Sequence, residues 1–208
     1  MIIKDFLGEK IYLISKDFYR ALRFNYIVHF VSPRKKVGNY EKCFVIGMPK
    51  TGTTSMKDFL ESHGSKHLTF NKRVNKFFKF KKFNKIKYLT SRFDSFDDFP
   101  WNDLKLIEFF MKNNYNYVFI YTMRDPNIKF ESEIRYHIKR KKLPPKEHER
   151  GKYVKNHIYH ENYCRKIAKK YNANILFIDV TTNKKSSQIL KNFLGLERDI
   201  PFPHSNIT

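Results

Sequence analysis

Short apolar runs, separated by stretches of helical periodicity, organise this chain. Three runs rich in β-branched and aromatic residues predict buried strands, at 43–46, 117–123 and 175–180. A weaker run at 66–70 predicts a further strand. Because helical patterns alternate with these runs, the sequence predicts an α/β fold, a three-layer sandwich with a central, mostly parallel sheet.

Apolar residues at helical spacing, with cap and stop residues at the ends, mark the segments between the strands. Asp125 and Pro126 predict a helix start, and Gly64 and Gly195 predict helix ends. The expected helices lie at 56–63, 104–111, 126–138, about 152–171 and 189–194.

The first forty residues differ from the rest. Apolar residues at helical spacing, with lysines between them, predict an amphipathic helix and a linker over 1–40. Packing on the domain is favoured over a membrane-surface helix. The α/β domain is expected over 41–208, with a basic insert at about 70–92. No apolar run has the length of a membrane span and no signal-like core is visible, so a cytoplasmic location is expected.

Composition adds a strong positive charge. The 208 residues include 42 Lys and Arg against 20 Asp and Glu, a formal net charge of +22. This charge favours polyanionic partners such as an anionic glycan or a membrane surface, although AT-rich coding is an alternative source. The insert interleaves aromatic and basic residues, a pattern that can bind nucleic acid but more often forms a solvated segment, so nucleic acid is not the favoured partner. Cys43 and Cys164 are expected to be buried free thiols.

A loop of small and hydroxyl residues follows the first strand. Such a loop directs backbone N–H groups and a helix N-terminus at one point, which suits an anion. The candidate anion-binding residues are Lys50, Thr51, Gly52, Thr53, Thr54 and Ser55. Gly47 and Gly52 have the Walker spacing, but Thr53 stands where that pattern has lysine. This difference argues against a nucleotide kinase.

A second cationic position lies where the strand at 117–123 ends. Arg124 comes directly before the predicted helix, and Ser132 lies on the early turns of that helix. Open α/β sheets bind ligands at the carboxyl ends of their strands, so Arg124 and Ser132 can share one phosphate. The alternative is that Arg124 pairs with Asp125 or another neighbour.

These motifs resemble those of a known enzyme family. The segment 49–55 closely resembles the phosphosulfate-binding loop of the sulfotransferases, which use PAPS (3′-phosphoadenosine 5′-phosphosulfate). Arg124-Asp125-Pro126 with Ser132 is similar to the family's 3′-phosphate signature. Further segments resemble one branch of the family: Asp94 to Trp101, His160-x-Asn162, Phe193-Leu194-Gly195 and Pro201-Phe202-Pro203-His204-x-Asn206. The resemblance covers about 43 to 206.

The chain also departs from the family pattern. Ser55 stands where the cytosolic small-molecule enzymes commonly have an adenine-stacking aromatic residue. Their C-terminal basic-glycine loop, which binds the 3′-phosphate, has no clear counterpart, and their catalytic histidine has no assigned equivalent.

The resemblance implies a PAPS-dependent sulfotransferase that acts on a hydroxyl or amine acceptor. Lys50 would neutralise charge on the bridging oxygen, and Gly52 to Ser55 would hold the phosphosulfate. A general base should deprotonate the acceptor, and the arrangement requires no metal. Asp98 is the first candidate base, His67 the second and Asp94 the third; Asp98 can alternatively be a helix cap or turn residue.

Two other classes stay open from the sequence. One is a P-loop nucleotide kinase or NTPase, and the other is a non-catalytic basic protein that binds nucleic acid or anionic surfaces. Within the sulfotransferase hypothesis, glycan, peptide tyrosine, lipid and small phenol are all possible acceptors.

Overall fold

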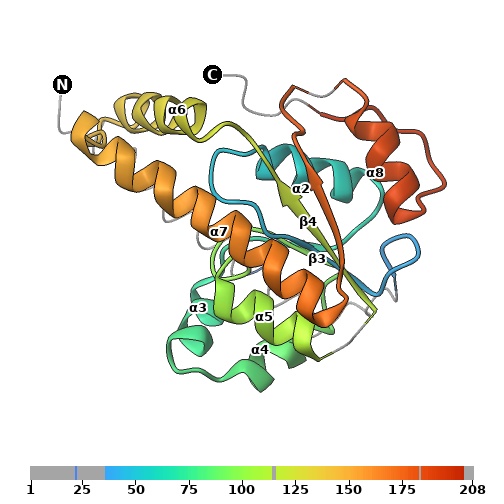
Figure 1. Ribbon diagram of the computed structural model, residues 1–208. Coiled ribbons are helices and arrows are strands. Elements are labelled where there is room, and N and C mark those ends of the chain that lie inside the picture. The colour runs from blue at the N-terminus through green and yellow to red at the C-terminus, as the bar shows by residue number, and fades with distance from the viewer. Residues whose placement is uncertain (1–21, 23–35, 114–115, 183, 204–208) are drawn as a thin grey trace. The chain divides into compact units, whose positions relative to one another are not determined.

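The computed structural model describes residues 22, 36–113, 116–182 and 184–203 (Figure 1). The chain divides into two compact units, Met1–Pro33 and Arg34–Thr208. The second, called the α/β unit below, carries every predicted strand and site residue. The amphipathic helix and linker predicted over 1–40 lie outside the described residues, apart from residues 22 and 36–40.

A parallel sheet forms the centre of the α/β unit. Its strands are β1 (Lys42–Val45), β2 (His67–Leu68), β3 (Ser95–Phe96), β4 (Tyr117–Thr122) and β5 (Asn174–Ile178). The strand order is β2-β3-β1-β4-β5, and every pairing among them is parallel. The α/β class with a parallel central sheet is therefore confirmed.

Helices connect the strands. They are α2 (Thr53–Ser62), α3 (Lys72–Lys79), α4 (Phe83–Thr90), α5 (Leu104–Lys112), α6 (Pro126–Lys139), α7 (Arg150–Tyr171) and α8 (Ser186–Leu194), with a short 3₁₀ helix, η1 (Glu147–Glu149). The predicted cap and stop residues lie at the ends of these helices. The Asp125 carboxylate accepts the N–H groups of Asn127 and Ile128, and Gly195 adopts a left-handed conformation after α8.

The sheet is covered on both faces because successive side chains of a strand point to opposite sides. Cys43 and Val45 of β1 pack with buried residues of α2 and α8. Phe44, between them in sequence, stacks on Phe119 and contacts Phe110 of α5. Figure 1 shows α5 and α7 side by side on this second face, where the Tyr163 hydroxyl donates to Glu108 across 2.7 Å.

Three parts of the α/β unit differ from the sequence-based expectation. Strand β3 lies inside the acidic segment 94–101, where its two residues pair with β1 and β2. The basic insert folds into α3 and α4, and the Asn71 side chain caps α3. Val37, expected in the linker, is buried in the core and pairs with Tyr40. Only for β3 do contacts distant in sequence decide the local structure; the Asn71 cap and the Val37–Tyr40 pair are local.

Two further predictions concern the cysteines and the helices. Cys43 and Cys164 are free and buried, as predicted, and burial raises the pKa of both thiols. Among the described helices, none combines the length and apolar character needed to cross a bilayer.

Candidate functional site

The direction in which the chain moves along the sheet changes between β1 and β4. After β1 the chain crosses toward β2, and after β4 it continues toward β5 on the opposite side. Adjacent strands whose connections leave in opposite directions form the topological switch point, where open α/β sheets bind ligands. Both predicted phosphate motifs follow these two strands. The topology therefore brings the loop after β1 and Arg124 to the same edge.

The loop after β1 packs closely against the end of β4. Val45 pairs with Ile120, and a Cβ atom on Gly47 would lie 1.9 Å from Thr122 Oγ1, so only glycine fits at position 47. The buried Thr51 hydroxyl donates to the Met48 carbonyl (2.7 Å) and lies 2.6 Å from Thr122 Oγ1. This hydroxyl is thus committed to the loop, and Thr51 has only its N–H group to offer a ligand.

The loop ends at a helix N-terminus that has no side-chain cap. Gly52, the N-cap residue, has φ 91°, and no side chain accepts a hydrogen bond from the first turn of α2. In the described part of the chain, the N–H and hydroxyl groups of Thr53 and Thr54 have no hydrogen-bond partner. Because such N–H groups attract anions, this end of α2 has the chemistry that the loop motif predicts.

Lys50 lies two residues before Gly52, and its side chain extends toward α6. Its backbone has φ 66°, a left-handed conformation that costs a non-glycine residue about 1–2 kcal/mol. Its ammonium group lies over the ring of Tyr136 in α6, 3.2 Å from the ring centroid. Partial burial lowers the pKa of Lys50, while nearby Glu133 opposes this shift. The side chain is therefore held toward α6 by an aromatic face.

Arg124 lies against the same loop. Its guanidinium donates to the Lys50 carbonyl across 3.3 Å. The Asp125 carboxylate instead caps α6, and no ion pair joins it to Arg124 among the described residues. Ser132, predicted to share a phosphate with Arg124, is buried on α6, and no hydrogen bond to its hydroxyl is found within the described segments. The structure therefore does not pair Arg124 with Asp125.

The three candidate bases lie in very different environments. Asp98 is exposed on an irregular segment two residues after β3, the strand beside β1. Its carboxylate accepts the Phe99 N–H (2.8 Å), and its φ is 64°. Since Phe96 pairs with Phe44, the segment with Asp98 leaves the sheet at the edge where the loop begins. Asp98 therefore has both the exposure and the edge that a base requires.

His67 and Asp94 are engaged inside the protein. The buried His67 ring lies 2.8 Å from Ser95 Oγ through Nδ1 and 3.0 Å from Asp97 Oδ1 through Nε2. Asp94 accepts the Lys66 N–H (2.9 Å), and its other oxygen lies 4.0 Å from the ammonium of Lys42. Neither side chain reaches solvent, so these contacts favour structural roles and leave Asp98 as the strongest candidate base.

His160 holds the Asp98 segment in place. Its Nε2 lies 2.8 Å from the Asn102 carbonyl, and its Nδ1 lies 3.2 Å from the Tyr121 hydroxyl. Burial lowers the pKa of His160, so the neutral ring donates to Asn102 at neutral pH. The resemblance pointed to His160 without giving it a role. In the sequence, the only sign of this contact is that His160 falls at the spacing of the inward-facing residues of α7.

A second buried histidine, His157, leads us to predict that the protein loses stability in acid. Its Nδ1 bonds the Tyr153 carbonyl (2.9 Å), and burial lowers the pKa of His157 from 6.5 to about 4. Its stabilising contribution is complete above pH 6.5 and is lost as the pH falls toward 4. At pH 5 this loss is about 2 kcal/mol.

Urea unfolding at pH 7 and pH 5 measures this effect. The wild type should lose more stability between the two pH values than His157→Gln does. His148→Gln, at an exposed site in η1, serves as the control and should behave like the wild type. Identical pH dependence in His157→Gln and the wild type would show that His157 is not the titrating group.

The basic insert lies beside the Asp98 segment. Phe78 of α3 contacts Phe99 edge-on, with ring centroids 5.3 Å apart. Between Glu61 and Asp94 the sequence contains no acidic residue. The exposed cations of α3, α4 and their connection are Lys72, Arg73, Lys76, Lys79, Lys81, Lys82 and Lys85. A strongly positive surface therefore adjoins the strongest candidate base.

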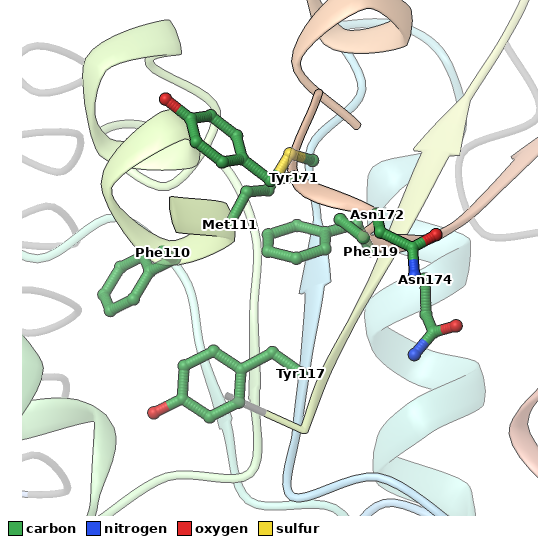
Figure 2. Close-up of a pocket in the computed structure, with 8 residues that line it drawn as sticks. Phe110, Met111, Tyr117, Phe119, Tyr171, Asn172 and Asn174 are labelled. Atoms are coloured by element: carbon green, nitrogen blue, oxygen red, sulfur yellow. The ribbon is translucent and has the colours of Figure 1, made fainter. Parts of the chain in front are cut away.

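A small cavity lies at the opposite edge of the sheet. Figure 2 shows it near the starts of β4 and β5, where Tyr117 and Asn174 border it. Its volume is about 40 Å³, enough for very few water molecules. This cavity is too small for a nucleotide and lies at the amino ends of the strands, so the carboxyl edge remains the candidate site.

Comparison with known proteins adds no assignment: no protein-family model matches this chain, and no curated protein matches it.

Proposed function

We propose that this protein is a PAPS-dependent sulfotransferase. One observation carries the proposal: the loop with Lys50, the cation Arg124 and the exposed carboxylate Asp98 follow three adjacent strands, β1, β4 and β3, at one edge of the sheet. A phosphate-binding helix end, a second cation and a base are the groups that sulfuryl transfer needs.

The residues at this edge fit a bisphosphate nucleotide. The uncapped start of α2 offers the N–H groups of Thr53 and Thr54 to a 5′-phosphosulfate. Arg124, which has no carboxylate partner in the described segments, and the buried hydroxyl of Ser132 offer donors to a 3′-phosphate. PAPS, when bound, supplies the sulfuryl group for transfer.

Asp98 and Lys50 would act in the chemical step. Asp98 accepts the proton of the acceptor as the acceptor oxygen or nitrogen bonds to sulfur. The bond between sulfur and the bridging oxygen breaks, and Lys50 neutralises the charge that develops on this oxygen of the departing bisphosphate.

The acceptor side of the site favours an anionic molecule. The exposed lysines of α3 and α4 adjoin Asp98 through the contact of Phe78 with Phe99. A positive surface raises the local concentration of anionic substrates. We therefore favour an anionic glycan among the possible acceptors.

Incubation with sulfur-labelled PAPS and separate pools of glycans, tyrosine peptides, lipids and phenols tests the proposal. We expect label in the anionic glycan pool without added metal. If no pool gains label while ATP is hydrolysed with Mg²⁺, the protein is instead a nucleotide hydrolase.

Arg124→Ala gives a prediction about nucleotide selectivity. Charged hydrogen bonds contribute about 1.5–3 kcal/mol each, so the variant should bind adenosine 3′,5′-bisphosphate about 10- to 150-fold more weakly. Adenosine 5′-monophosphate should bind almost as it does to the wild type, as measured by calorimetry. Arg135→Ala, at an exposed site on α6, is the matched control. Equal weakening of both nucleotides would show that Arg124 does not contact the 3′-phosphate.

A further inference from the structure

Lys129, on α6, is a buried cation without a counter-ion. Only 4% of the residue is exposed, and within the described segments its ammonium group has no hydrogen bond or ion pair. Placing a charge in a protein interior is costly unless an opposite charge or hydrogen bonds compensate for it. A nearly buried lysine with neither is well suited to bind an anion from outside the chain, because its Nζ is not among the fully buried polar atoms.

The carboxylates nearest to Lys129 are already engaged. Asp125 and Glu161 both influence its charge. The Asp125 carboxylate caps α6 by accepting two backbone N–H groups, and the Glu161 carboxylate binds the guanidinium of Arg165 through two contacts of 3.0 and 2.8 Å. Neither lies within 4 Å of the ammonium, so neither neutralises Lys129 directly.

Lys129 lies on α6, the helix that begins directly after Arg124 and Asp125. Burial lowers the pKa of Lys129, and the positive charge of Arg124 lowers it further. Ser132 lies three residues later on α6, and residues three apart are neighbours on a helix surface. All three side chains can donate hydrogen bonds, and none has a carboxylate partner in the described part of the chain.

We infer that Lys129 binds a phosphate- or sulfate-type oxyanion together with Arg124 and Ser132. The inference deepens the proposed function, since the anion is either the 3′-phosphate of the nucleotide or a sulfate-like group of the acceptor. Two cations and a hydroxyl supply the charge-assisted bonds that such an anion requires. Lys129 is thus a ligand-binding residue and not a structural cation.

Lys129→Met separates these two roles, because it keeps the length of the side chain and removes its charge. A ligand-binding Lys129 predicts an unliganded melting temperature equal to or above that of the wild type, since a buried uncompensated charge is removed. It also predicts that adenosine 3′,5′-bisphosphate binds about 10- to 150-fold more weakly, while the 5′-monophosphate binds within about twofold of wild type. Lys139→Met, at an exposed site on α6, should change neither quantity.

The pH dependence of binding gives a second readout. Burial lowers the pKa of Lys129 to about 8, so its charge is present at pH 7 and is lost above pH 8. The charged or titratable groups around it are Arg124, Asp125, His157, His160 and Glu161. Both histidines are neutral in this range, because burial lowers the pKa of each. Affinity for the bisphosphate should therefore fall above pH 8 in the wild type and stay flat in Lys129→Met.

Inorganic sulfate makes the test independent of the nucleotide. If Lys129→Met affects only sulfate binding, measured with the bisphosphate present, the anion belongs to the acceptor and the inference holds. If the wild type binds neither nucleotide, the proposed function fails, and loss of sulfate-dependent thermal stabilisation in the variant still supports the anion site. Unchanged binding of all three probes, or a lower unliganded melting temperature, overturns the inference. Lys129→Gln repeats these measurements should Lys129→Met not fold.

Discussion

Lys50→Ala should lower the rate of sulfuryl transfer by about 10²–10³ and leave the fold intact. In the proposed mechanism the ammonium group neutralises charge that appears only as the bond to the bridging oxygen breaks, so its removal should reduce kcat more than substrate binding. Lys50 lies in a loop and its side chain contacts the Tyr136 ring near the surface of the site, so little core packing is lost. Rates with PAPS and a labelled acceptor measure the effect.

Lys57→Ala is the matched control for this prediction. It removes one positive charge from α2, where Lys57 lies 3.7 Å from Glu61, and it leaves the loop unchanged. The control should keep wild-type rates, because a surface ion pair contributes little. Wild-type turnover by Lys50→Ala would show that Lys50 does not stabilise the leaving group.

Asp98→Asn should lower turnover by about 10²–10⁴ and leave affinity for the bisphosphate nearly unchanged. The substitution removes the proton acceptor and keeps the shape of the side chain. Asparagine also tolerates the left-handed conformation that Asp98 adopts, and its carbonyl can still accept the Phe99 N–H. The variant therefore tests the chemical role of the carboxylate without disturbing its segment.

Asp103→Asn provides the comparison for Asp98→Asn. Asp103 lies in the same segment and accepts the Lys105 N–H at the start of α5, a capping role that asparagine fills equally well. This variant loses the same charge and should keep full activity. Normal turnover by Asp98→Asn would remove Asp98 from the mechanism, and an unfolded Asp98→Asn variant would show that Asp98 is a structural turn residue.

The sequence predicts most of the scaffold because its signals there are local. The apolar runs of β1, β4 and β5 and the cap formed by Asp125 depend on neighbouring residues. Two glycine stops, at Gly64 and Gly195, likewise depend on backbone conformation alone. These elements fix the edge at which the loop and Arg124 meet, so this part of the candidate site follows from the sequence.

The remainder of the site depends on contacts between distant segments. The two residues of β3 form a strand only because β1 and β2 lie on either side. His67 is buried against Asp97, which makes it a weaker candidate base than the exposed Asp98. Nothing near His67 in the sequence reveals this burial. The sequence gives no sign that Lys129 is buried, because a lysine among polar residues of a helix usually faces solvent.

Binding of adenosine 3′,5′-bisphosphate to the wild-type protein, measured by calorimetry in the presence of a metal chelator, is the decisive test of the proposed function. We expect one site per chain, with tighter binding of the bisphosphate than of adenosine 5′-monophosphate or ATP. Absence of bisphosphate binding, together with Mg²⁺-dependent binding and turnover of ATP, would contradict it.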